Sequence, residues 1–179
     1  VIYVGQIEDD EDALDKYKQW ILGLLDNNIQ PVVSLNHFTL PHWYLQKYKG
    51  LANEQCDVRD MFINFVMAFV THMGPEVWSH PNWKNKTVFL TTFNEPFLYC
   101  LHSYLLGRRP PQSHSISEFY KVVRSICSIH IKVYEMLKNY FADNTALTVK
   151  ISMANNICVF KPADESNESN VQFCKKLSY

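Results

Sequence analysis

An amide and a carboxylate stand next to each other directly after a run of apolar and β-branched residues. Residues 88–93 form the run, and Asn94, Glu95 and Pro96 follow it. Such a run is typical of a strand buried on both faces of a parallel sheet, and proline ends it because proline cannot continue the hydrogen-bond ladder. Ligands bind at the carboxyl ends of strands in α/β sheets. We therefore expect Asn94 and Glu95 to border a site, with Glu95 able to act as a general acid.

A second run of the same kind ends in polar side chains that can bind a hydroxylated ligand. Residues 31–35 are mostly apolar, Asn36 and His37 follow them, and Pro41 closes the next loop. Amide and imidazole groups make directional hydrogen bonds to hydroxyl groups. Spacing alone also permits a structural interpretation, in which Glu95 caps the next segment and Asn94 makes a turn. Two strand-end motifs in one chain favour the chemical interpretation.

Both motifs resemble glycoside hydrolase family 1, the retaining β-glycosidases. The sequence TFNEP at 92–96 resembles the acid/base signature on the fourth barrel strand of that family. The sequence LNHFTLP at 35–41 resembles its third-strand motif in the archaeal-type form. The resemblance implies that Glu95 is the general acid/base, that Asn94 bonds the sugar 2-hydroxyl, and that His37 bonds another hydroxyl. It also implies a β-glycoside as substrate, without cofactor or metal.

The resemblance continues to a third strand end. Residues 150–157 resemble the fifth strand of archaeal-type members, and Asn155 and Asn156 follow the strand. We expect Asn155 to bind substrate on the aglycone side, although a turn role is the alternative. Arg124 and Ser125 depart from the family, because they stand where a His-Asn pair is common.

Retaining hydrolysis needs a second carboxylate, and the sequence offers none in the right place. The mechanism places a nucleophilic carboxylate about 5–5.5 Å from the acid/base. The seventh-strand nucleophile of the family has no counterpart here, so we expect this chain to carry the acid/base half of a site and to be inactive alone. The alternative is a non-catalytic remnant, a sugar-binding or assembly module.

Hydrophobic periodicity predicts three helices that alternate with three strands. Apolar residues recur at helical spacing, and Gly74 with Pro75 is expected to end the second helix. The predicted helices cover about 14–25, 58–73 and 119–140, and the strands 31–35, 88–93 and 147–153. This order predicts an α/β fold, a partial (β/α)8 TIM barrel of three parallel strands, within a single domain spanning 1–179. Loops are expected after the first two strands, and a polar tail with at most one helical turn from residue 161.

Composition excludes several classes of partner. The chain has 179 residues and a net charge of −1, which gives no sign of nucleic-acid binding or of an anionic membrane surface. Its five cysteines form no C-x-x-C pair, and its seven histidines show no metal-ligand spacing. Free thiols favour a reducing, cytoplasmic location. The open edges of a partial sheet predict self-association.

Overall fold

The fold is built on a three-stranded parallel sheet. The computed structural model describes residues 11–53, 56–144, 147–156 and 160–177. The strands are β1 (Val32–Ser34), β2 (Thr87–Asn94) and β3 (Thr148–Ala154), and β2 lies in the middle. Val33 of β1 is in register with Leu90 of β2, which is in register with Ile151 of β3. The predicted parallel order is therefore confirmed.

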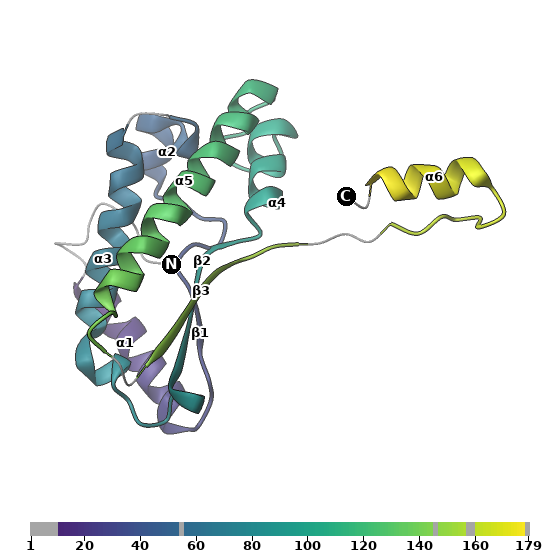
Figure 1. Ribbon diagram of the computed structural model, residues 1–179. Coiled ribbons are helices and arrows are strands. Elements are labelled where there is room, and N and C mark those ends of the chain that lie inside the picture. Colours follow the sequence, from purple (N-terminus) through teal and green to yellow (C-terminus); the bar gives the residue numbers. More distant parts are fainter. Residues whose placement is uncertain (1–10, 54–55, 145–146, 157–159, 178–179) are drawn as a thin grey trace.

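Three long helices pack against one face of this sheet (Figure 1). They are α1 (Glu11–Asp26), α3 (Cys56–Trp78) and α5 (Ile116–Tyr140), and each precedes one strand of the sheet. The alternation is the arrangement that right-handed βαβ crossovers produce. Two β-α-β crossovers in one parallel sheet are what the predicted partial (β/α)8 barrel requires.

The core lies between the sheet and these helices. Val88 and Leu90 of β2 are 0% and 1% exposed, whereas Phe89 between them is only half-buried. Side chains of a strand alternate between faces, so Val88 and Leu90 point toward the helices. The buried residues of α5 recur at three- or four-residue spacing and form its core-facing stripe: Val122, Ile126, Ile129, Val133 and Leu137.

The start of α5 forms half of a capping box. The Ser115 hydroxyl accepts a hydrogen bond from the backbone N–H of Glu118 at 3.2 Å. The Glu118 carboxylate does not return the bond, because it accepts from the hydroxyl of Ser113. The N–H of Ser115 instead donates to the carbonyl of Tyr104 at 2.9 Å. The cap thus also joins α5 to the segment before it.

Both predicted loops after the strands contain helix, which corrects the sequence-based expectation. The segment after β1 forms α2 (His42–Tyr48) and the 3-10 turn η1 (Gly50–Ala52). The segment after β2 forms α4 (Pro96–Cys100) and the π-helical turn η3 (Leu101–Leu105). Short helices carry little periodicity of their own, so packing decides them: Tyr44 is 2% exposed.

Two further boundaries differ from the prediction. Gly74 has a φ of 61° and kinks α3, but the chain resumes helical geometry at Pro75 and continues to Trp78. The tail contains a ten-residue helix, α6 (Glu168–Leu177), that stands away from the sheet and its helices. The side-chain oxygen of Asn167 caps it by accepting from the N–H groups of Ser169 and Asn170. Asn167 is therefore the helix-start signal in the sequence that the prediction of a polar tail overlooked.

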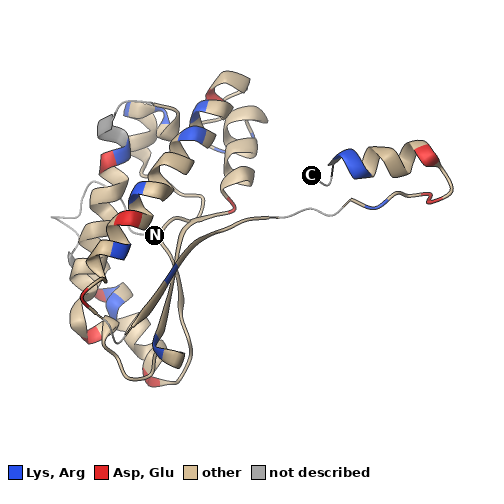
Figure 2. Ribbon diagram, in the orientation of Figure 1, with Lys and Arg blue, Asp and Glu red and all other residues tan. Residues whose placement is uncertain are grey.

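Charged side chains are interspersed along the helices. Figure 2 shows Lys and Arg alternating with Asp and Glu over the helical layer, without a single-sign stripe. Within the described residues, none of the helices is long and apolar enough to cross a membrane.

Candidate active site

The carboxyl ends of β1 and β2 place three polar side chains together. The backbone N–H of Asn94 donates to the carbonyl of Asn36 at 2.9 Å, which aligns the two strand ends. The side-chain Nδ2 of Asn94 lies 3.3 Å from Nε2 of His37. Glu95 follows Asn94 directly, so the structure brings His37, Asn94 and Glu95 together at the carboxyl end of the sheet.

Glu95 occupies a backbone conformation that is unfavourable for its residue type. Its φ is 45° and its ψ is 53°, in the left-handed region, and it stands at the N-cap of α4. Non-glycine residues in this region cost about 1–3 kcal/mol and concentrate at functional sites. The surroundings fix the conformation from both sides. The Glu95 N–H donates to the carbonyl of Ala154 at 2.6 Å, and the Glu95 carbonyl accepts from the N–H of Tyr99 at 3.0 Å.

The third strand end supplies an amide to the Glu95 carboxylate. The side-chain Nδ2 of Asn156 donates to Oε1 of Glu95 at 3.3 Å. Asn155, the residue chosen from the sequence, instead lines a small cleft beside Pro96 and Met153. Asn155 and Asn156 are neighbours in the chain, and the sequence alone did not decide which of them lies at the site. Substrate binding by Asn155 stays a prediction.

An arginine from the segment after β2 reaches the motif after β1. The guanidinium of Arg109 lies 4.7 Å from the ring centroid of Phe38, and that ring meets His37 edge-on at 5.3 Å. Phe38 has a φ of 67°, which turns the chain sharply after His37. The cation–π contact was not predictable, because it joins residues far apart in the chain.

A buried tyrosine also joins the two segments behind the site. The Tyr104 hydroxyl donates to the carbonyl of Lys49 and accepts from the N–H of Leu51, both at 3.2 Å. It lies 3.3 Å from the hydroxyl of Tyr99. Tyr104 is fully buried, and this burial raises its pKa to about 12. The neutral phenol therefore serves as a fixed link between η1 and η3.

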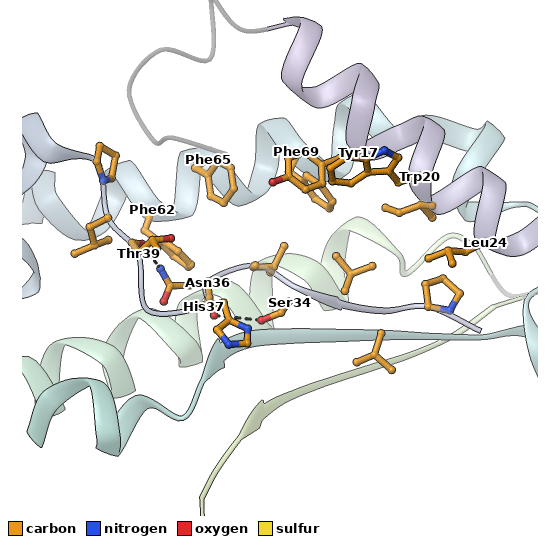
Figure 3. A pocket seen from close by; sticks show the side chains of 17 residues that line it. Tyr17, Trp20, Leu24, Ser34, Asn36, His37, Thr39, Phe62, Phe65 and Phe69 are labelled. Atoms are coloured by element: carbon orange, nitrogen blue, oxygen red, sulfur yellow. Dashed lines mark hydrogen bonds between the residues drawn. The ribbon is translucent and has the colours of Figure 1, made fainter. Parts of the chain in front are cut away.

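An apolar groove of about 280 Å³ runs along the outer edge of β1. Figure 3 shows aromatic rings of α1 and α3 facing the strand across the groove, with His37 at one end. Val32 is 65% exposed and Trp20 is 63% exposed. In the described part of the chain, the outer edges of β1 and β3 pair with no further strand.

Among the described residues, no other acidic side chain stands at the carboxyl end of a strand. Within the described ranges, the others belong to helices, to the turn after α5, or to the segment between β3 and α6. No group of three or more metal-ligating side chains is placed to hold a metal ion in that part of the chain. Glu95 is therefore the carboxylate around which the described site is built.

Comparison with known proteins identifies the family. The model of glycosyl hydrolase family 1 matches residues 3–178. The chain belongs to glycosyl hydrolase family 1. It is similar to β-glucosidase 25 of rice, with 25% identity over 178 residues that make up 92% of this chain and 33% of the relative. It is also similar to β-glucosidase A of Thermotoga maritima, with 27% identity over 156 residues that make up 87% of this chain and 31% of the relative.

Solved structures of family 1 enzymes share the fold. The β-glycosidase from Pyrococcus horikoshii superimposes with a TM-score of 0.73 and 27% sequence identity, over 94% of this chain and 34% of that one. This chain thus spans about a third of the curated family 1 relatives that it matches. The matched neighbours are (β/α)8 barrels, of which the described sheet represents three strands.

Proposed function

We propose that this chain provides the acid/base half of a retaining β-glycosidase active site, acting on β-linked glycosides of the glucoside, galactoside and mannoside class. Glu95 protonates the leaving-group oxygen and later activates water. Asn94 donates to the sugar 2-hydroxyl, and His37 bonds a second hydroxyl of the same sugar. The nucleophile comes from strands outside the three described.

One observation carries this proposal: Asn94 and His37 meet at 3.3 Å beside Glu95 at the open end of a parallel sheet. The amide and imidazole converge from two strands, so they can bind adjacent hydroxyl groups of one ring. Asn156 adds a donor to the carboxylate of Glu95. The strained backbone of Glu95 is a further sign of a functional position, because nothing in local packing requires a glutamate there.

A second candidate is a sugar-binding or assembly module without catalysis. The observation that favours it is the placement of the other described acidic residues, none of which stands at a strand end. A barrel piece with intact sugar-binding donors and no nucleophile would bind glycosides weakly and leave them unchanged. The two candidates differ in whether a completed barrel turns over.

The chain forms one domain of residues 1–179 that self-associates through its sheet edges. Exposed apolar side chains beside β1, with Trp20 63% and Val32 65% exposed, support this part of the proposal. Size-exclusion chromatography over a concentration series tests it, and a monomer at all concentrations would contradict it. Free thiols at Cys100 and Cys127 support a reducing compartment such as the cytoplasm.

A hybrid barrel tests the catalytic proposal. Residues 11–156 replace the matching units of the Thermotoga maritima β-glucosidase, which supplies the remaining strands. We expect the hybrid to hydrolyse an aryl β-glucoside and the Glu95→Gln hybrid to be slower. Glu135→Gln, an exposed change on α5, is the matched control and should keep full activity. A folded hybrid that binds glucoside without turnover would favour the second candidate.

A further inference from the structure

The middle strand contains an irregularity immediately before the site. Thr91 of β2 is in register with Ser152 of β3, and Asn94 is in register with Ala154. Two residues of β2, Thr92 and Phe93, therefore stand opposite one residue of β3. This two-against-one count defines a β-bulge, and bulges often re-aim side chains next to active sites.

The bulge changes which face of the sheet the side chains after it point to. Thr92 contacts His130 of α5, and Phe93 stacks on Phe62 of α3 with ring centroids 4.9 Å apart. Two consecutive side chains thus point toward the helices, which regular alternation forbids. Asn94 consequently returns to the opposite face. Without the extra residue, Phe93 would point away from the helices and Asn94 would be buried against them.

A hydrogen-bonded pair holds the bulge in place. The Thr92 hydroxyl is fully buried, lies 2.8 Å from Nδ1 of His130, and donates to the carbonyl of Ser152 at 3.3 Å. With its one proton assigned to the Ser152 carbonyl, the hydroxyl accepts from Nδ1–H of His130. This contact joins β2, β3 and α5 at the point where the ladder is interrupted.

The imidazole of His130 suits a donor role. Burial lowers its pKa, which favours the neutral ring near pH 7. The bond to Thr92 then selects the tautomer that carries the proton on Nδ1.

We propose that Thr92 and His130 are positioning residues for Glu95, and that their hydrogen bond holds the bulge that aims Asn94 and Glu95 at the sugar. Neither residue touches substrate. The role as an aid to catalysis rests on the proposed function, but the effect on the geometry of Glu95 does not.

Nuclear magnetic resonance on this chain tests the geometric part. The side-chain ¹⁵N shifts of His130 should report a protonated Nδ1, and Thr92→Val should abolish that signature. Exchange of the Glu95 amide, relative to that of Val88 on the same strand, should accelerate about 3- to 10-fold in Thr92→Val, as expected for one lost hydrogen bond. Thr92→Ser keeps the hydroxyl and should restore the slow exchange.

Thr91→Val is the matched control, because Thr91 is a 6% exposed neighbour on the same strand. Its relative exchange at Glu95 should equal that of the unaltered chain. The proposal is overturned if Thr92→Val and Thr91→Val change the ratio equally, or if His130 carries its proton on Nε2.

The hybrid barrel tests the catalytic part. Thr92→Val should lower kcat for glycosides with poor leaving groups more than for activated ones, a partial version of the Glu95→Gln effect. If Glu95→Gln shows this dependence and Thr92→Val does not, the positioning role is wrong. If Glu95→Gln itself shows none, the proposed function fails, whatever the resonance data say.

Discussion

Replacing Tyr104 by phenylalanine should destabilise the protein through one missing hydroxyl. In the structure that hydroxyl accepts from the Leu51 N–H and donates to the Lys49 carbonyl, in a fully buried position. The Leu51 N–H loses its acceptor, and a buried group left unsatisfied costs about 1–3 kcal/mol. We therefore expect the free energy of unfolding to fall by about 1–3 kcal/mol. For a chain of this size the melting temperature should fall by about 2–12 °C.

Urea titration followed by circular dichroism measures the loss. Tyr120→Phe is the matched control, because Tyr120 is 59% exposed on α5 and its change should stay within about 0.5 kcal/mol. Hydrogen exchange adds a local readout, since the Leu51 amide should exchange faster in Tyr104→Phe. Equal stabilities for the two variants would refute the claim that this hydroxyl links η1 to η3.

Three further outcomes are expected. Ser115→Ala should lower the free energy of unfolding by about 1 kcal/mol, because α5 loses its N-terminal cap. Ser117→Ala is the control and should not lower it. Urea titration measures both variants, and equal losses would contradict the role of Ser115 as the cap. Because burial lowers the pKa of His130 below 6.5, the native state binds fewer protons than the unfolded chain, so stability is full above pH 6.5 and falls as the pH drops below it. His130→Gln should reduce this loss in parallel urea titrations, and an unchanged pH dependence would exclude His130 as a source. The chain alone should not hydrolyse an activated aryl β-glycoside, and turnover that disappears in Glu95→Ala would show that a nucleophile is present after all.

The alternation of helices and strands could be predicted because long amphipathic patterns decide long elements. The stripe of α5 and the apolar run of β2 each carry enough residues to outweigh local ambiguity. The segments after the strands could not be predicted in the same way. There, Tyr104 is buried and bonds to Lys49 and Leu51, which lie far from it in the sequence, and no local pattern reveals these contacts.

The site residues at the ends of β1 and β2 could be proposed from the sequence, but the direction in which their side chains point could not. A strand pattern places Asn94 and Glu95 at a strand end, yet simple alternation would turn Asn94 toward the helices. The bulge at Thr92 and Phe93 corrects this, and it depends on register with β3. The same limit explains Asn156, whose contact with Glu95 is set by how β3 ends.

The most direct test of the acid/base role is the dependence of rate on the leaving group in the hybrid barrel. Rates are measured for a series of aryl and alkyl β-glucosides, with Glu95 and with Glu95→Gln. A general acid contributes about 10²- to 10⁴-fold when the leaving group needs protonation. We predict a loss of that order for alkyl glucosides and a much smaller loss for the most activated aryl glucosides. Equal slowing across the series would contradict the assignment of Glu95 as the acid/base.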